Sequence, residues 1–401
     1  GSTSALINLI VNLFIGLSVG TNVLVAQSYG AGNQKDLQDT VHTSVLSSLI
    51  FGCIVLVIGI SLSAPMLELM GTPEEVLDQA CLYMRIYFIG MPASMLYNFG
   101  AAILRAVGDT QRPLYFLFIA GVVNVVLNLF FVIGFHLDVA GVAIATVISQ
   151  CISAGLVLLC LVKSHAPYQV NLRHLRIKKD KLLGMVKIGL PAGIQGCSFS
   201  ISNVLIQSSI NSFGAVAMAG NTAASNIEGF VSTAMDAFSQ AALSFTGQNV
   251  GAGKLKRVNR ILPLCVALVT GTGLVLGIGA YLLGPQLLGI YSTEAEVIAF
   301  GMRRMSICCV LQFFGGLIGV MVGVLRGMGY SFVPMAITIG FVCGFRVIWI
   351  LTVFALLPTL EVIYISYPIT WGLAALCDVL CFFFVRKHLA KKQQLASVEG
   401  K

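Results

Sequence analysis

The chain has 401 residues, of which 57% are hydrophobic and only 10% are charged. Soluble domains carry about 25% charged residues, so this composition excludes a soluble globular protein. The formal net charge of +8 does not indicate nucleic acid, because the basic residues fall in one set of loops. Apolar stretches long enough to cross a bilayer recur along the whole chain. The composition therefore predicts an all-α polytopic membrane protein whose surface faces lipid.

Eleven membrane-spanning helices are predicted from these apolar stretches. Each is bounded by a short polar segment, and none resembles a cleaved signal peptide. In chain order the predicted spans are 5–29, 41–68, 79–104, 113–135, 139–162, 183–211, 216–246, 258–288, 295–325, 333–357 and 361–385.

Charged residues alternate between the loops that join these spans. One set of loops is basic and includes Lys35 and the C-terminal tail, whereas the other is acidic and includes Glu74 and Glu294. The positive-inside rule places the basic set in the cytoplasm. We therefore expect a multi-pass protein of the cell (cytoplasmic) membrane, with a cytoplasmic C-terminus and a monomeric state.

A short signature occurs twice in the chain. Gln27–Gly32 reads Gln-Ser-Tyr-Gly-Ala-Gly, and Gln248–Gly253 reads Gln-Asn-Val-Gly-Ala-Gly, 221 residues later. The same offset carries Leu104–Gly108 onto Leu325–Gly329. A constant offset indicates two gene-duplicated halves, each a bundle of similar helices. The alternative is that glycine-rich turns at helix ends resemble one another without a common origin.

The repeat defines the expected domains. The second half has one helix before the span that ends near Gly247, and the first half has no counterpart. We therefore expect a further helix upstream of Gly1, giving five plus six helices of a 6+6 pattern; a natural eleven-span chain is the alternative. The predicted parts are an N-terminal bundle at 1–162, a basic linker at 163–182, a C-terminal bundle at 183–386 and a tail at 387–401. The linker is expected to fix topology and to touch anionic lipid headgroups.

Nothing in the sequence indicates a metal or a cofactor. The eleven cysteines lie mostly within apolar stretches and form no CxxC pair, and no two of the five histidines stand at i, i+4. Such cysteines are typical of small buried apolar residues. A membrane-embedded enzyme is disfavoured further, because no convergent nucleophile or metal-binding set is present.

Ionisable residues at membrane depth are costly and are functional candidates by default. Glu228 and Asp236 lie in the span 216–246, Arg346 in the span 333–357 and Asp378 in the last span. Arg346 and Asp378 are candidates for a structural ion pair. Arg304 lies near the outer end of its span, where an arginine can extend to the interface.

The span 216–246 carries its polar residues on one face. At 100° per residue they form a stripe about 80° wide, with Glu228 near the middle of the membrane. Two acids on one stripe favour a face that lines a water-filled cavity, and the alternative is a stripe that only hydrogen-bonds neighbouring helices. The stripe consists of Asn221, Ser225, Glu228, Ser232, Asp236 and Ser239.

Two other spans offer candidates for the same cavity. Gln195, Ser198 and Asn203 lie in the span 183–211. Asn124 and Asn128 stand at i, i+4 in an earlier span and share a face. These amides either line the cavity or join helices by hydrogen bonds.

With these motifs, the chain resembles the multidrug and toxic compound extrusion (MATE) family of secondary transporters. The resemblance rests on the repeated signature, on the stretch 104–113 with its partner at 325–334, and on Gly189-Leu190-Pro191. It covers essentially the whole chain. It implies twelve helices in two six-helix lobes, a central cleft and alternating access driven by Na⁺ or H⁺. It also implies organic cations and other amphipathic drugs as substrates, and no cofactor besides the coupling ion.

The chain departs from the family in its acids. In many members the first helix carries a coupling aspartate, and here that helix has no counterpart. One branch has an Asn-x-x-x-Asp sequence where this chain has Asn124 and Asn128, and another has a glutamate where this chain has Phe199. Neither ion site is carried over intact. The resemblance and the stripe together assign coupling to Glu228, with Asp236 supporting ion access.

The leading hypothesis is therefore an antiporter that exports organic cations or amphipathic drugs in exchange for H⁺ or Na⁺. The alternative within the same superfamily is a flippase for a lipid-linked precursor. A flippase needs cationic residues in its cleft to hold pyrophosphate, and Arg346 is the only deep cation that the sequence indicates. This disfavours the flippase, and an enzyme is the least favoured of the three.

Overall fold

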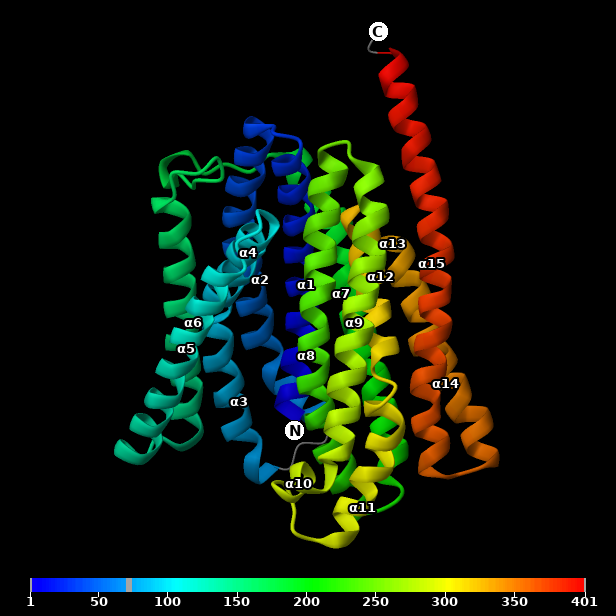
Figure 1. The fold of residues 1–401 in the computed structure, drawn as a ribbon. Helices are drawn as coiled ribbons and strands as arrows, with labels where there is room; N and C mark the ends of the chain where they lie inside the picture. The colour runs from blue at the N-terminus through cyan, green and yellow to red at the C-terminus, as the bar shows by residue number, and fades with distance from the viewer. Residues whose placement is uncertain (1, 70–73, 400–401) are drawn as a thin grey trace. The chain divides into compact units, whose positions relative to one another are not determined.

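The computed structural model describes residues 2–69 and 74–399, and the side chains of these residues except 2–6, 9 and 392–399. Every regular element in this part of the chain is a helix (Figure 1). Among these residues, eight helices are long and apolar enough to cross a membrane, and two bent helix pairs raise the number to ten. The helix with the polar stripe is not among them, because its polar residues lower its hydropathy. The predicted all-α polytopic architecture is confirmed.

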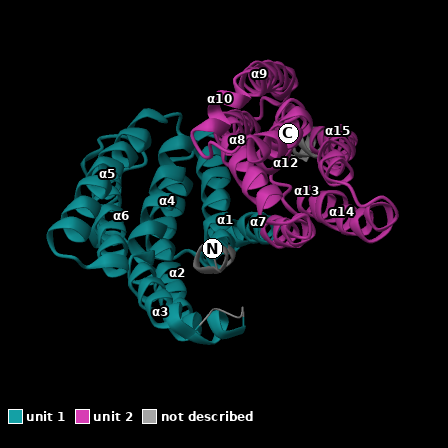
Figure 2. Ribbon diagram, turned by 90° about the horizontal axis from the view of Figure 1, so that it is seen from below, with its two compact units in different colours: residues 1–197 teal, residues 198–401 magenta. Residues whose placement is uncertain are grey.

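The chain divides into two compact units, residues 1–197 and 198–401, which Figure 2 draws in two colours. Unit 1 consists of α1 to α6, a short linker helix and the first part of α7. Its elements are α1 (Ser2–Gly30), α2 (Gln34–Leu69), α3 (Glu74–Ile89), α4 (Met91–Ala106), α5 (Gln111–Leu129), η1 (Phe130–Gly134), α6 (Asp138–Lys163), η2 (Leu172–His174) and α7 (Lys179–Asn211).

Unit 2 contains the end of α7 and all later elements. Three of its helices, α11, α13 and α14, continue into π-helical segments. The elements are α8 (Ala215–Gly251), α9 (Leu255–Leu282), α10 (Gly284–Gly289), α11 (Ala295–Arg304), η3 (Met305–Cys309), α12 (Phe313–Gly327), α13 (Phe332–Ile337), η4 (Thr338–Phe345), α14 (Arg346–Trp349), η5 (Ile350–Phe354) and α15 (Leu360–Glu399).

The boundary between the units lies inside α7, whereas the sequence predicts it at the linker. Gly189 and Gly193 of α7 approach α1 so closely that a Cβ at either would meet the backbone of Leu17 or Leu13. Small residues allow this approach in a membrane bundle. The first part of α7 is therefore packed into unit 1.

The 221-residue repeat recurs in the backbone. Gly32 and Gly253 have φ of 68° and 71°, and Gly108 and Gly329 have φ of 95° and 91°. Each turn closes with hydrogen bonds to carbonyls at the preceding helix end: Asn33 N donates to Ser28 O at 3.2 Å, and Lys254 N donates to Asn249 O at 2.8 Å. These are glycine C-caps of the Schellman type, in which only glycine accepts positive φ without strain.

A bent span also recurs in the two units. The α3–α4 pair bends by 46° at Gly90, and the α11–α12 pair bends by 42° around Leu311, 221 residues later. Pro92 explains the first bend, because proline removes a helix hydrogen bond. The π-helical η3 precedes the second bend, where no proline is present. Different local causes therefore give the same bend.

Unit 2 is held together at the contact between α8 and α12. Gly319, Gly323 and Gly327 form a stripe of small residues on α12. A Cβ at Gly323 would meet Ser239 O at 2.5 Å, and one at Gly327 would meet Leu243 O at 2.7 Å. The two backbones thus touch through the stripe, which fixes the position of α8 and of its polar residues.

Candidate functional site

A buried ion pair joins α8 to α11 in unit 2. Arg304 Nε donates to Glu228 Oε1 at 2.9 Å, and Arg304 Nη2 donates to Glu228 Oε2 at 2.8 Å. Both residues are only 6% exposed. This parallel, two-bond geometry is among the strongest hydrogen-bonded arrangements by which a protein holds a carboxylate. Both oxygens of the predicted coupling acid are therefore occupied by a neighbouring side chain.

The ion pair continues into a chain of amides. Arg304 Nη1 donates to Asn221 Oδ1 at 2.7 Å, and Asn221 Nδ2 donates to Gln207 Oε1 at 3.0 Å. Gln207 Nε2 donates in turn to Asn211 Oδ1 at 2.9 Å. The chain runs from the fully buried Asn221 to the exposed Asn211 near the end of α7. Polar groups thus connect the ion pair with the surface of unit 2.

A second buried arginine lies beside the first. Arg346 is 1% exposed, donates through Nη2 to Thr370 Oγ1 at 2.9 Å, and lies 4.1 Å above the ring of Tyr367. Arg304 lies 5.3 Å from the same ring. The tyrosine face stabilises cations, but among the described residues a single carboxylate, Glu228, faces two guanidinium groups here. With all three ionised, the cluster carries one net positive charge.

Both arginines are placed by π-helical segments. Arg304 directly precedes η3, and Arg346 lies where η4 ends. A π-helix bonds i to i+5 and changes the phase of the residues that follow, and such segments occur often at functional sites. A projection at 100° per residue therefore does not predict on which side of the helix these arginines lie.

Two predictions about the charged residues are wrong. Arg304 does not extend to the interface, because Glu228 and Asn221 offer it three hydrogen bonds inside the bundle. Arg346 does not pair with Asp378. Its guanidinium is held by Thr370 and Tyr367 on α15, two and three turns before Asp378. The cation that acts on Asp378 is Arg326.

Some residues in the polar stripe of α8 contact neighbouring helices, and others lie at the surface. Ser232 Oγ accepts from Gln312 Nε2 at 2.7 Å, and Ser239 lies against the glycine stripe of α12. Ser225 is half-buried, and Asp236 is exposed. The buried part of the stripe thus joins α8 to the α11–α12 span, which corresponds to the hydrogen-bonding alternative. Asp236 remains the part of the stripe that is open to the surroundings of unit 2.

The candidates on α5 and α7 take no part in the hydrogen bonds of the Glu228–Arg304 pair that are described above. Asn128 Nδ2 donates to Asn124 Oδ1 at 2.8 Å, and Asn124 Nδ2 donates to Ser149 Oγ of α6 at 3.1 Å. This amide pair joins α5 to α6. On α7 Gln195 is 7% exposed, Ser198 is half-buried and Asn203 is exposed. Within unit 2 the structure brings Asn221, Glu228 and Arg304 together, and within unit 1 it pairs Asn124 with Asn128.

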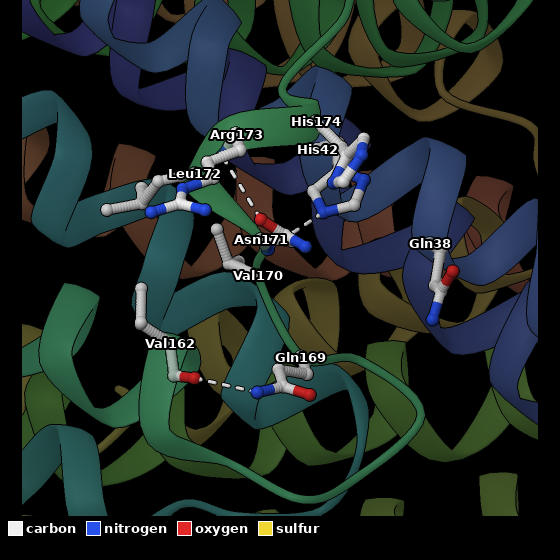
Figure 3. A pocket seen from close by; sticks show the side chains of 9 residues that line it. All are labelled: Gln38, His42, Val162, Gln169, Val170, Asn171, Leu172, Arg173 and His174. Carbon is white, nitrogen blue, oxygen red and sulfur yellow. Dashed lines mark hydrogen bonds between the residues drawn. The ribbon is translucent and has the colours of Figure 1, made fainter.

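The linker of unit 1 is fastened to α2 and α6 and lines, together with these helices, an open pocket of about 510 Å³ (Figure 3). His42 Nε2 accepts from Asn171 N at 3.1 Å, and Gln169 Nε2 donates to Val162 O at 2.9 Å. Arg176 pairs with Asp39, and Lys181 with Asp36, each at 3.0 Å. Two linker cations, Arg176 and Lys181, which were expected to meet lipid headgroups, thus neutralise acids of α2. The pocket is lined by Gln38, His42, Val162, Gln169, Val170, Asn171, Leu172, Arg173 and His174.

Replacing His42 with leucine should loosen this linker, because the N–H of Asn171 loses its acceptor. One hydrogen bond contributes about 1 kcal/mol, which corresponds to about fivefold more frequent local opening. Trypsin cleavage after Arg173 or Arg176 in the detergent-purified chain should accelerate to that extent. Gln38→Ala, which alters the same pocket, is the control. Equal cleavage rates in His42→Leu and the parent chain would contradict the anchoring role.

No cluster of three or more histidine, cysteine, aspartate or glutamate side chains that could hold a metal occurs in the described part of the chain. Two repeated bundles of apolar helices, with a carboxylate and two arginines buried inside the second bundle, define a polytopic membrane protein of the kind that secondary transporters form. The MatE family model matches residues 1–130 and 191–354. The chain therefore belongs to the MATE family, whose members are transporters.

Relatives that are similar in sequence include proteins named for multidrug resistance. The chain is 28% identical to the probable multidrug resistance protein YoeA of Bacillus subtilis, over 96% of this chain and 84% of that protein. It is 25% identical to the probable multidrug resistance protein NorM of Thermotoga maritima, over 81% of this chain and 71% of that protein. The chain is thus a member of a multidrug efflux family.

Solved structures share the fold. A crystal structure of MATE in complex with MaL6 matches with a TM-score of 0.89 at 22% identity, over 98% of this chain and 90% of that one. The Vibrio cholerae MATE transporter VcmN in its bent form matches with a TM-score of 0.87 at 20% identity, over 96% of this chain and 88% of that one. At these identities the likeness establishes the fold alone.

Proposed function

We propose that the chain exports amphipathic organic cations by antiport with H⁺ or Na⁺. The family and the multidrug resistance names of its relatives support export of drug-like molecules. The observation that carries the coupling site is the Glu228 carboxylate, buried at span depth and held by Arg304. At this depth a carboxylate needs a positive partner, so Arg304 can leave Glu228 only when another cation, such as H⁺ or Na⁺, takes its place.

In this proposal the coupling ion competes with Arg304 for Glu228. A proton or Na⁺ that binds the carboxylate releases the guanidinium, and the cluster around Tyr367 then contains two unneutralised arginines. Like charges at such distances in a low-dielectric interior repel strongly. The repulsion moves α11 relative to α8 and disfavours a bound cationic substrate. Loss of the ion restores the pair and the affinity for the substrate. Asp236 supports ion access, and Asn221, Ser225 and Ser232 line the cleft.

Proteoliposomes provide the direct test. The purified chain should move a fluorescent cation such as ethidium against its gradient when an opposing H⁺ or Na⁺ gradient is imposed. A gradient of only one of the two ions should suffice, and its dissipation should stop transport. Transport at the same rate without any ion gradient would contradict antiport.

A flippase for lipid-linked precursors is the second candidate, and one observation favours it more than the sequence does. Two buried arginines, Arg304 and Arg346, lie in the described part of unit 2, where the sequence indicates only Arg346. Arginine is suited to pyrophosphate. Arg304 is already paired with Glu228, however, so the cation exporter is preferred. Growth in the presence of cationic drugs, compared with rescue of a flippase-deficient strain, distinguishes the two functions.

The proposed orientation places the linker, the turns at Gly32 and Gly253, and the C-terminal tail in the cytoplasm. The basic residues of these segments support it through the positive-inside rule. Trypsin should then cut the linker in sealed inverted membrane vesicles and leave it intact in right-side-out vesicles. Cleavage in the right-side-out vesicles alone would reverse the orientation.

A further inference from the structure

Asp378 is a buried acid that the proposed ion pair does not use. It lies on α15, which packs against α12, and its side chain is 0% exposed. No group in the described part of the chain hydrogen-bonds either carboxyl oxygen. A buried ionised carboxylate without hydrogen bonds is strongly unfavourable, whereas a neutral carboxylic acid is tolerated. The surroundings of Asp378 therefore favour the protonated form in this conformation.

The neighbouring helices offer Asp378 little charge. One turn earlier, Ala374 and Ala375 join an apolar cluster with Ile318, Val322 and Val342. The charged and titratable groups that interact with Asp378 are Arg326 of α12 and Cys381 of α15 itself. The neighbouring α13 has no titratable side chain, and Cys343 of η4 interacts with Arg346 instead.

The repeat provides an internal comparison for this position. The residue 221 positions earlier is Val157, which is also 0% exposed and packs against Gly100 of α4. The counterpart of Arg326 is Arg105, so the first unit keeps the arginine and has valine in place of the acid. A branched apolar residue of similar size therefore satisfies the packing. Packing alone gives no reason for a carboxylic acid in the second unit.

We propose that Asp378 is a proton-binding site that is neutral while α12 and α15 are packed as observed. When a transport step opens the α12–α15 contact to water, the carboxylic O–H bond breaks, the proton passes to water, and the carboxylate is stabilised by the positive charge of Arg326. Closure of the contact takes the proton back. The inference rests on the proposed antiport function and gives its second unit a proton site separate from Glu228.

This site would link protons to conformation by ordinary population shift. Protonation removes the cost of burying the carboxylate and so favours the packed arrangement, and deprotonation favours the open one. In the open arrangement the positive charge of Arg326 stabilises the ionised carboxylate of Asp378. No residue other than Asp378 changes its protonation in this step.

The test uses the full chain with Asp378→Asn, which is always neutral, and Asp378→Val, which is the residue of the first unit. Infrared spectra should contain the carbonyl band of a protonated carboxylic acid in the parent chain and in Glu228→Gln, and the band should be lost in both Asp378 variants. The valine variant keeps the test open if asparagine disturbs folding, because Val157 shows that valine is accepted there. An unchanged band in the folded variants would overturn the proposal.

Proton counting separates this inference from the proposed function. In weakly buffered detergent solution with a pH indicator, ethidium binding should release about one proton fewer from each Asp378 variant than from the parent chain. Equal proton release by the variants and the parent would overturn the Asp378 site while leaving antiport intact. Absence of gradient-driven ethidium transport by the parent in proteoliposomes, with the infrared band still assigned to Asp378, would instead refute only the proposed function.

Discussion

Glu228→Gln is expected to abolish gradient-driven export and to destabilise unit 2. Glutamine keeps the shape of the side chain but cannot neutralise Arg304, which is buried with three hydrogen bonds to Glu228 and Asn221. Removing one partner of a buried ion pair costs about 3–5 kcal/mol, because the other charge is left uncompensated. In proteoliposomes, ethidium export under an imposed gradient should fall to the level of protein-free liposomes, and the apparent Tm should fall with it.

Two further variants separate coupling from stability. Glu228→Leu combined with Arg304→Met replaces both charges by apolar side chains, which is close to neutral for stability. This double variant should recover most of the Tm lost in Glu228→Gln, short of the hydrogen bond that Asn221 Oδ1 accepts from Arg304, but it should not export. Glu361→Gln breaks the half-exposed Arg303–Glu361 pair, 3.6 Å long, and should change stability by less than about 1 kcal/mol and leave export unchanged. Normal export by the double variant would show that coupling occurs elsewhere.

Gly323→Ala should separate α8 from α12 and thereby disable the site from a distance. A Cβ at this position would lie 2.5 Å from the backbone oxygen of Ser239, which belongs to a helix and cannot move aside alone. Overpacking of this kind costs about 1–3 kcal/mol. The purified variant should have a lower apparent Tm in detergent, and export should decrease because α8 carries Glu228.

Gly271→Ala on α9 is the matched control for this glycine. Gly271 is exposed, and a Cβ there would meet nothing within 4 Å. Replacing an unhindered helical glycine by alanine stabilises a helix by about 0.5–1 kcal/mol. The two substitutions should therefore shift the Tm in opposite directions. A Tm change of the same sign and size in both would mean that the α8–α12 contact does not depend on Gly323.

The fold could be predicted because its signals are local. Apolar length defines the spans, and the turns at Gly32, Gly108, Gly253 and Gly329 have the same glycine caps that the repeated sequence indicates. The position of the boundary between the units could not be predicted in the same way. It depends on the fit of α7 against α1 at Gly189 and Gly193, which no linker composition reveals.

The site was only partly predictable for a physical reason. Glu228 and Asn221 could be found, because α8 is regular and its polar face follows the 100° step. Their partner could not, because Arg304 lies 76 residues away in sequence and directly precedes a π-helical segment. The same difficulty affects Arg346 and Asp378, since neither periodicity nor composition determines which helices meet. The sequence does place Arg304 near the end of a span. Only the structure shows that this arginine is buried against Glu228.

The capped turns have a consequence for how the chain is made. In each unit, three residues join one pair of consecutive helices (α1–α2 and α8–α9), and four join another (α4–α5 and α12–α13). In each turn, neighbouring N–H groups bond the carbonyls at the end of the preceding helix. A hairpin of two such helices therefore exposes few unpaired backbone groups when it enters the lipid. Preformed helical hairpins can then insert into the bilayer in the order of their synthesis. During biogenesis these hairpins can form early from local contacts. The contacts between helices that are distant in sequence, such as the α8–α11 contact that carries the ion pair, form later.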